Sequence, residues 1–347
     1  MKLQSLTLNG SAGQSEILIG RGLLEQAAER CLSVFSPSRI HIVSDTNVAP
    51  LYLERLRQQF TLPVSATVLP AGEEHKRLSA VEGIYHDMLA AGMTRKDLVI
   101  ALGGGVVGDI TGFAASSYLR GVPLCQIPTT LLAQVDSSVG GKTGVDLPEG
   151  KNLVGAFYQP RLVLIDPALL ASLPAETFAD GMAEVIKYGC IAGSEILTTV
   201  SHQNVDIDKV IYECVKIKRD VVQEDEHDTG LRMILNFGHT IGHACEKLEN
   251  YTGLTHGQAV AIGMAAAMRL SHALDGGADH SGQLIPLLQK YNLPVELKHD
   301  REEIYHALLS DKKKFGGTVN FILVRQLGKA DIVPIEAERL HELLLKI

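Results

Sequence analysis

The stretch DLVIALGGGVVGD, residues 97–109, decides the fold that this sequence predicts. After its first residue the run is apolar without alternation up to the glycines, which is typical of a strand buried on both faces of a sheet. Gly103, Gly105 and Gly108 follow at the spacing G-x-G-x-x-G, and residues 110–119 are compatible with a helix. A strand, a glycine turn and a helix favour a site for a dinucleotide pyrophosphate, because glycine admits the phosphates closely and the helix N-terminus offers N–H groups. The motif alone is weak, so a tight turn without a ligand stays the alternative, and several strands precede this turn where a standard dinucleotide fold has only one.

Strand and helix signals alternate through the first half of the chain. A helical pattern covers residues 78–91, and the expected strands are residues 15–20, 39–44, 63–69, 97–102, 124–127 and 161–165. Strands separated by helices predict a parallel sheet with helices on both faces. After about residue 166 helical periodicity dominates, in residues 174–191, 207–223, 231–248, 257–274, 281–290 and 301–309. The predicted fold class is α/β, with a parallel-sheet domain at residues 1–170, an all-helical domain at residues 171–347, and a ligand site in the cleft between them.

The composition is that of a globular protein of about two domains, with 347 residues, 46% hydrophobic and 21% charged. The net charge of −8 argues against a binder of nucleic acids or anionic membranes, which would carry a net positive field. The longest apolar stretch, residues 259–268, is shorter than the ~20 residues of a membrane span, and the N-terminus has no apolar signal segment. Five cysteines without a C-x-x-C pair favour reduced thiols in a cytoplasmic protein.

Residues 231–248 carry a polar stripe. Spacings of four, three, four and three residues place five polar side chains on one helix face: Arg232, Asn236, His239, His243 and Glu246. The opposite face is apolar, and Gly238 and Gly242 flank the stripe and would allow a close approach. Solvated faces prefer Glu, Lys and Gln, so this composition favours a functional face over a merely solvated one.

The histidines of this region are candidate metal ligands. His239 and His243 stand four residues apart, a spacing that can chelate a metal ion, and His256 begins the next helical segment. Glu184, in the helix GMAEVIKYG, shares a face with Lys187 that by itself is more typical of a solvated helix surface. Two histidines and one carboxylate would form a three-ligand zinc site with an open position, the catalytic type. The residues by themselves do not choose which two histidines bind.

Positively charged residues recur beside glycines, asparagines and the metal-ligand candidates: Arg120, Lys142, Lys151, Lys187, Lys218 and Arg232. Each alone is most simply a surface residue, but together in a cleft they would suit a substrate with a phosphate and a carboxylate. Two loops carry residues of the kind that contact a ribose, although ordinary loop chemistry is the simpler interpretation: Asp45, Asn47, Glu73 and Lys76. The segment SSVGGKTG is not a P-loop, because Asp136 stands where that motif needs glycine.

These segments together resemble the 3-dehydroquinate synthase family of the sugar phosphate cyclase superfamily. The resemblance extends from SDTN at residues 44–47 to DKK at residues 311–313. Its most specific parts are GGGVVGDITGFAASSYLRG, IPTTLLAQVDSSVGGKTGVD, GKNLVGAFYQP, GMAEVIKYG, LRMILNFGHTIGHACE and HGQAVAIGM. The family implies an N-terminal NAD-binding domain, a C-terminal helical domain with a catalytic divalent metal, zinc or cobalt, and a homodimer.

Carried over position by position, the resemblance implies three metal ligands: Glu184, His239 and His256. His243 would then act on the substrate, in proton transfer near its phosphate. The implied NAD contacts are Asp45, Asn47, Glu73, Lys76, Gly103, Gly104, Gly105, Val106, Val107, Gly108, Asp109, Thr129, Thr130, Lys142 and Lys151. The implied substrate contacts are Arg120, Asp136, Lys142, Asn152, Lys187, Lys218, Arg232, Asn236 and one lysine of the pair Lys312 and Lys313.

Two positions depart from the family pattern. Gln258 stands just after His256, where the family often has glutamate, and Asp228 stands where the family usually has glutamate. We expect Gln258 to support the metal ligands from behind. Asp228 is one methylene shorter than glutamate, which leaves its substrate contact open.

The reaction that the resemblance implies converts 3-deoxy-D-arabino-heptulosonate 7-phosphate, a phosphorylated sugar acid, to 3-dehydroquinate and phosphate. It is the second step of the shikimate pathway to chorismate and the aromatic amino acids. NAD takes hydride from C5, which the metal polarises, and phosphate leaves by β-elimination. Hydride then returns to C5, the ring opens, and an intramolecular aldol addition closes the carbocycle. NAD is regenerated in every turnover and is therefore a catalyst.

Other classes of protein stay as alternatives. Cyclases that make 2-deoxy-scyllo-inosose or epi-valiolone act on substrates without a carboxylate, which Arg232 and Asn236 argue against. A metal-dependent polyol or alcohol dehydrogenase would need no phosphate-binding lysines and would release NADH. A non-catalytic nucleotide-binding module would leave the three metal-ligand candidates unexplained.

Overall fold

The computed structural model describes residues 3–11, 13–276, 278–312 and 317–347. By their contacts these residues form two compact units. The first unit is Met1–Pro174 together with Lys218–His227, and the second is Ala175–Ile217 together with Asp228–Ile347. None of the described helices combines the length and the apolar character that crossing a membrane requires.

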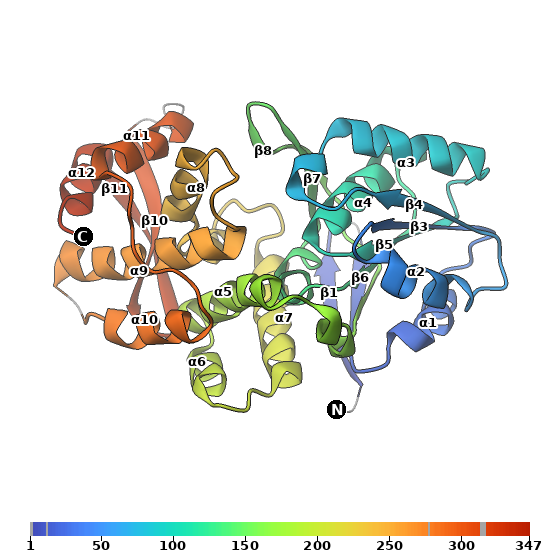
Figure 1. The fold of residues 1–347 in the computed structure, drawn as a ribbon, viewed down its shortest axis with the longest axis horizontal. Helices are drawn as coiled ribbons and strands as arrows, with labels where there is room; N and C mark the ends of the chain where they lie inside the picture. The colour runs from blue at the N-terminus through green and yellow to red at the C-terminus, as the bar shows by residue number, and fades with distance from the viewer. Residues whose placement is uncertain (1–2, 12, 277, 313–316) are drawn as a thin grey trace. The chain divides into compact units, whose positions relative to one another are not determined.

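The first unit is built on a seven-stranded sheet in the order β1-β2-β9-β6-β5-β3-β4 (Figure 1). Its strands are β1 (Gln4–Gly10), β2 (Gly13–Ile19), β3 (Ile40–Asp45), β4 (Val64–Leu69), β5 (Leu98–Gly103), β6 (Leu124–Pro128) and β9 (Leu162–Ile165). Neighbouring strands are parallel except β1 and β2, which are antiparallel. The six expected strands and the parallel sheet are confirmed, and β1 is an additional edge strand.

Helices cover both faces of this sheet: α1 (Ala27–Val34), α2 (Ala49–Arg57), α3 (Leu78–Ala90) and α4 (Gly105–Ser117). Alternate residues of β5 belong to two different hydrophobic cores. Ile100 and Leu102 pack with residues of α1 and α2, whereas Val99 and Ala101 pack with residues of α3 and α4. The uninterrupted apolar run of β5 is therefore explained, because every one of its side chains is buried on one face or the other.

A hairpin adds a small second sheet to this unit. It consists of β7 (Lys142–Leu147) and β8 (Gly150–Phe157), which pair antiparallel. These strands were not expected from the sequence, because glycines interrupt the alternation of polar and apolar side chains. Gly144 and Gly155 face each other across the pair, and a Cβ atom on Gly155 would lie 2.1 Å from the Thr143 carbonyl oxygen.

His41 is a buried histidine of β3 whose ring is satisfied in its neutral form. Its Nε2 lies 3.0 Å from Thr67 Oγ1, and the Thr67 hydroxyl donates to Asp87. Nε2 is therefore the donor, and Nδ1 accepts from the Ser65 hydroxyl at 2.8 Å. Burial lowers the pKa of His41 to about 4, although the charge of Asp87 works in the opposite direction.

This histidine should make the stability of the fold depend on pH. Between pH 6.5 and pH 4 the unfolded chain binds a proton that the folded chain refuses, so the free energy of unfolding falls as pH falls. We expect the unaltered protein to lose about 3 kcal/mol more than a His41→Gln variant between pH 7 and pH 4, as measured by urea unfolding. The exposed His86 offers a control, since His86→Gln should leave the pH dependence unchanged.

The second unit contains the helices α5 (Ala175–Ile191), α6 (Ser194–Ser201), α8 (His239–Leu248), α9 (His256–Asp275), α10 (Ser281–Lys290), α11 (Arg301–Lys312) and α12 (Ala337–Leu344). Helix α7 (Ile207–Glu224) contributes its residues up to Ile217 to this unit and the others to the first. The helical character is confirmed, but the expectation of helices alone needs correction. Strands β10 (Thr318–Gln326) and β11 (Lys329–Glu336) form an antiparallel hairpin. Contacts of β10 with α9 bury Phe321 and Leu323.

Candidate active site

The glycine turn joins β5 to α4 without a spare residue. Gly103 ends the strand, Gly104 caps the helix and Gly105 begins it. A Cβ atom on Gly103 would lie 2.7 Å from Val107 Cβ, and one on Gly104 would lie 3.0 Å from Thr130 Cγ2. No described side chain caps the helix. The N–H groups of its first turn are thus available to a phosphate at the carboxyl edge of the sheet.

Other expected NAD contacts follow neighbouring strands at the same edge. Asp45 ends β3 and Asn47 follows it, while Thr129 and Thr130 follow β6. Because β3, β5 and β6 are parallel neighbours, their carboxyl ends lie side by side. Asp45 Oδ1 accepts from the N–H groups of Asn47 and Val48 at 2.8 and 2.9 Å, which holds this carboxylate in its loop.

Lys76 is buried and connects two further candidates. Its Nζ donates to Asp109 Oδ2 and to Asn152 Oδ1, both at 2.6 Å. Burial lowers the pKa of Lys76, but the charges of Asp109, Glu73 and Asp146 and the hydrogen bond to Asp109 together outweigh burial and raise the pKa above its ordinary value. The ammonium group therefore stays charged at neutral pH. Glu73, in the turn just before it, also raises this pKa.

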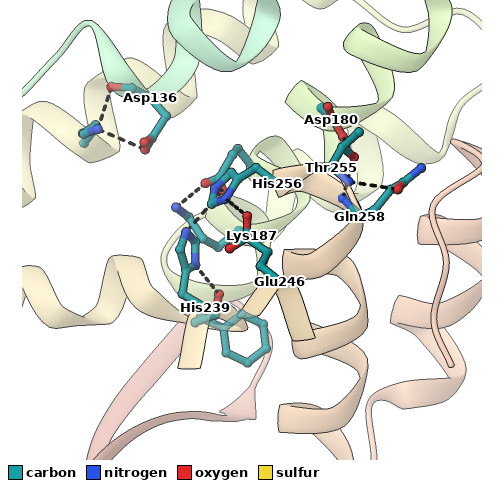
Figure 2. A network of polar contacts seen from close by, with 11 residues as sticks. Asp136, Asp180, Lys187, His239, Glu246, Thr255, His256 and Gln258 are labelled. Carbon is teal, nitrogen blue, oxygen red and sulfur yellow. Dashed lines mark hydrogen bonds and ion pairs between the residues drawn. The ribbon is translucent and has the colours of Figure 1, made fainter. Parts of the chain in front are cut away.

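Lys218 and Asp136, both expected substrate contacts, bind each other within the first unit. Lys218 Nζ donates to the Asp136 carbonyl oxygen at 2.6 Å and lies 3.1 Å from Asp136 Oδ1 (Figure 2). Lys218 is buried, whereas Lys142 at the start of β7 is exposed and Lys151 in β8 is half-buried. The two hairpin lysines can therefore meet a ligand from solvent.

Some of the expected substrate contacts lie far from the glycine turn or outside the described residues. Arg120 is exposed and follows the last turn of α4, about 20 Å along the helix from the glycine turn. Lys312 ends α11, and its side chain lies outside the described residues, as does all of Lys313.

Helix α5 presents its polar face to the interior. Glu184 and Lys187 are each 1% exposed, so the interpretation of this face as a solvated surface is wrong. The two side chains form an ion pair between Lys187 Nζ and Glu184 Oε2. Burial of a charge is tolerated when a partner compensates it, and this pair meets that condition.

The polar stripe does not lie on one continuous helix. A 3₁₀ turn, Leu231–Asn236, precedes α8, and Gly238 separates the two with a φ of 80°. The prediction of an uninterrupted helix over 231–248 is therefore wrong, because the left-handed conformation of Gly238 stops the first segment. The close approach expected at the glycines is confirmed. A Cβ atom on Gly242 would lie 2.8 Å from the Ala259 carbonyl oxygen of α9.

Three expected metal ligands converge in the second unit (Figure 2). His239 Nε2 lies 3.5 Å and His256 Nε2 lies 3.3 Å from the same oxygen, Glu184 Oε1. One ligand atom from each residue lies within 4.8 Å of the others. Two imidazole nitrogens and a carboxylate oxygen are the donor set of a catalytic zinc site.

The start of α9 places His256. Thr255 caps the helix in a capping box, accepting from the Gln258 N–H while the Gln258 side chain accepts from the Thr255 N–H. The Thr255 hydroxyl donates to Asp180 of α5, and a Cβ atom on Gly257 would lie 2.4 Å from Asp180 Cα. Because the capping box works with either glutamine or glutamate, it accounts for Gln258 where the family often has glutamate.

Charges around the cluster affect the two histidines differently. Burial lowers the pKa of His239 to about 3, so this ring is neutral at physiological pH. Burial also acts to lower the pKa of His256, but the neighbouring carboxylates of Glu184 and Glu246 together outweigh it and raise the pKa above its ordinary value. The position of His256 therefore stabilises positive charge.

A second group of potential ligands overlaps the first. His243, Glu246 and His256 also offer donor atoms within 4.8 Å of one another. His243 is exposed, and its ring lies perpendicular to that of His239 with centroids 5.4 Å apart. His256 thus lies between two carboxylates, Glu184 on one side and Glu246 on the other.

A cavity of about 650 Å³ opens beside this cluster. Its walls include the candidates Asn236, His239 and His243, and Asp228 lines it in spite of its shorter side chain. The wall formed by β10, where Thr318, Asn320 and Ile322 line the cavity, was not expected from the sequence. The alternation of polar and apolar residues in TVNF, residues 318–321, was a signal that could have indicated it.

Comparisons with known proteins identify relatives that match nearly the whole chain. The 3-dehydroquinate synthase of Pelobacter propionicus is 44% identical over 350 residues, which cover 96% of this chain and 97% of that protein. A crystal structure of 2-deoxy-scyllo-inosose synthase complexed with carbaglucose-6-phosphate, NAD+ and Co2+ is 27% identical, with a TM-score of 0.85 over 99% of both chains. The 2-epi-5-epi-valiolone synthase of Streptomyces hygroscopicus subsp. jinggangensis, with NAD+ and Zn2+ bound, is 29% identical, with a TM-score of 0.86 over 96% of both chains.

The fold is that of a sugar phosphate cyclase. Two family profiles match consecutive parts of the chain: 3-dehydroquinate synthase N-terminal at residues 66–180 and 3-dehydroquinate synthase C-terminal at residues 181–314. The chain belongs to the 3-dehydroquinate synthase family.

Proposed function

We propose that this protein converts 3-deoxy-D-arabino-heptulosonate 7-phosphate to 3-dehydroquinate and phosphate. The observation that carries the proposal is the convergence of Glu184, His239 and His256, in a chain that belongs to this family. The relatives at 44% identity favour this substrate over those of the cyclases at 27% and 29% identity.

The residues present fit a divalent metal, zinc or cobalt. Neutral His239 offers Nε2, and Glu184 and His256 complete a three-ligand set with room for a substrate oxygen. The residues of the first unit fit NAD, because the glycine turn leaves the N–H groups of α4 available and Asp45 lies at the same edge of the sheet. When bound, the metal supplies polarisation of the C5 hydroxyl and NAD supplies a transient hydride acceptor.

The chain's own residues bind and orient the substrate. Arg232 is buried, so water screens its charge weakly, and it suits the substrate carboxylate. Asn236 and His243 line the cavity beside the metal ligands, where His243 would move a proton near the phosphate. Lys187 pairs with the ligand candidate Glu184, and we assign it to the substrate contacts. The remaining expected contacts form the rest of this proposal: Arg120, Asp136, Lys142, Asn152, Lys218, and Lys312 or Lys313.

The proposal also covers the roles of the two domains, the oligomeric state and the cellular compartment. We assign NAD binding to residues 1–170 and metal and substrate binding to residues 171–347. We also assign the protein to the cytoplasm and expect it to form a homodimer. All five cysteines are buried and no disulfide joins them, which supports a reducing compartment. Analytical ultracentrifugation tests the dimer.

The enzyme assay uses purified protein, a catalytic amount of NAD, zinc or cobalt, and the heptulosonate phosphate. We expect one phosphate and one dehydroquinate per substrate without net NADH, and loss of activity with a chelator. Accumulating NADH without phosphate would instead identify a dehydrogenase. Turnover only of glucose 6-phosphate or sedoheptulose 7-phosphate would identify another cyclase and refute the role of Arg232.

A further inference from the structure

The two histidines of the metal cluster are held from behind in different ways. His239 Nδ1 lies 3.1 Å from the Phe237 carbonyl oxygen, so this nitrogen donates and Nε2 is left toward Glu184. His256 also turns Nε2 toward Glu184, and its Nδ1 lies 3.8 Å from Glu246 Oε1 (Figure 2). A metal-binding histidine usually donates its other ring N–H to such an acceptor, which fixes both the tautomer and the ring orientation.

Glu246 is a buried carboxylate that is not among the expected metal ligands, NAD contacts or substrate contacts. It is 1% exposed and lies in α8, one turn after His243. A buried carboxylate is costly to a fold unless a charged or donating group compensates it. The ring of His256 is such a group, because its Nδ1 lies 3.8 Å from Glu246 Oε1.

We propose that Glu246 is a positioning residue that orients the His256 ring for metal binding by accepting a hydrogen bond from its Nδ1. The inference rests on the proposed metal site. The two carboxylates then have different roles. Glu184 faces Nε2 of both His239 and His256, whereas Glu246 faces Nδ1 of His256. Closure of the 3.8 Å separation to hydrogen-bond length would accompany metal binding.

The competing role for Glu246 is that of a ligand, in the group with His243 and His256. The direction of the His256 ring argues against it. Both Nε2 atoms point at one oxygen of Glu184, which places the metal on that side, and a single imidazole cannot offer Nδ1 to Glu246 as donor and to a metal as ligand at once. Glu246 would therefore contact the ligand His256 and not the metal itself.

The test compares three variants. Glu246→Ala removes the acceptor, and Glu246→Gln keeps an acceptor oxygen in the same place. Glu249→Gln removes a half-buried carboxylate three residues further along, which pairs with His299. Cobalt affinity is measured by competition with a chelator, and the visible absorption of bound Co2+ reports the geometry of its ligands. We expect affinity to fall about 10- to 100-fold in Glu246→Ala with a changed spectrum, to recover largely in Glu246→Gln, and to be unchanged in Glu249→Gln.

The outcomes separate the possible roles. Equal affinity and an equal spectrum in Glu246→Ala and Glu249→Gln would overturn the positioning role. A loss in Glu246→Ala as large as that in His256→Ala would also overturn it, because Glu246 would then be a ligand. If unaltered protein binds no Co2+, the proposed metal site fails and the inference fails with it. Circular dichroism establishes that each variant is folded, and Glu246→Gln decides the question if the alanine variant is not.

Discussion

Replacing His256 by alanine should abolish tight metal binding and lower kcat/KM about 10³-fold or more. His256 Nε2 is one of two nitrogens beside Glu184 Oε1, and without it the metal keeps two protein ligands. Charge stabilisation by a metal contributes several kcal/mol at a reacting oxygen, and each 1.36 kcal/mol is a factor of ten in rate. Metal content of the purified variant and its steady-state kinetics with added Zn2+ measure the two effects.

A matched control lies on the same helix. His272 is an exposed histidine near the end of α9, and His272→Ala should keep full metal content and activity. Glu184→Gln should behave like His256→Ala, because the amide keeps the shape of the side chain and removes its negative charge. Unchanged metal content in either Glu184→Gln or His256→Ala would refute the assignment of ligands.

Gly263→Ala is expected to lower the free energy of unfolding by more than 3 kcal/mol and to weaken Co2+ binding at least tenfold. Helices α8 and α9 cross here, and a Cβ atom on Gly263 would lie 1.9 Å from the Gly238 carbonyl oxygen. That neighbour is backbone, so no change of rotamer can relieve the overlap and the helices must separate. His239 follows Gly238 and His256 begins α9, so separation moves two of the three ligand candidates apart. Urea unfolding and cobalt titration measure these changes.

Gly282→Ala serves as the control for this substitution. Gly282 is exposed in α10, and a Cβ atom there would meet no described atom within 4 Å. Alanine should leave stability unchanged or raise it by up to about 1 kcal/mol, because glycine is a poorer helix former. Similar effects of the two substitutions would show that the α8–α9 contact does not set the position of the ligands.

The elements that the sequence predicted well have local causes. The apolar run before the glycine turn forms β5 because both of its faces are covered, and α3, α5, α9 and α10 lie within a few residues of their expected ranges. The break at Gly238 was missed, because a glycine inside a helical pattern can be tolerated or can adopt a positive φ, and only the packing of α8 against α9 decides between these. The β10–β11 hairpin was missed because a short apolar run such as FILV is compatible with a helix as well as a strand.

The candidate site was likewise predicted from the sequence only in part. Motifs in the sequence offered Glu184 and the histidines His239, His243 and His256 as candidate ligands. The family resemblance carried by those motifs implied the set Glu184, His239 and His256. Spacing along one helix, however, paired His239 with His243, whereas in the fold Glu184 meets His239 and His256. The burial of the polar face of α5 was also not predicted, since Glu184 and Lys187 lie in the interior and not at a solvated surface.

The sequence by itself determined the α/β order of elements, the glycine turn and the residue types available for chemistry, because these depend on neighbours within one strand or helix. Only the tertiary structure decided which histidine turns toward Glu184, that Lys187 compensates its charge, and that Glu246 lies behind His256. Those relations join α5, α8 and α9, and they depend on how closely the helices pack at Gly242, Gly257 and Gly263. Distances of this kind follow from contacts between segments remote in sequence, which no periodicity within a single segment can encode.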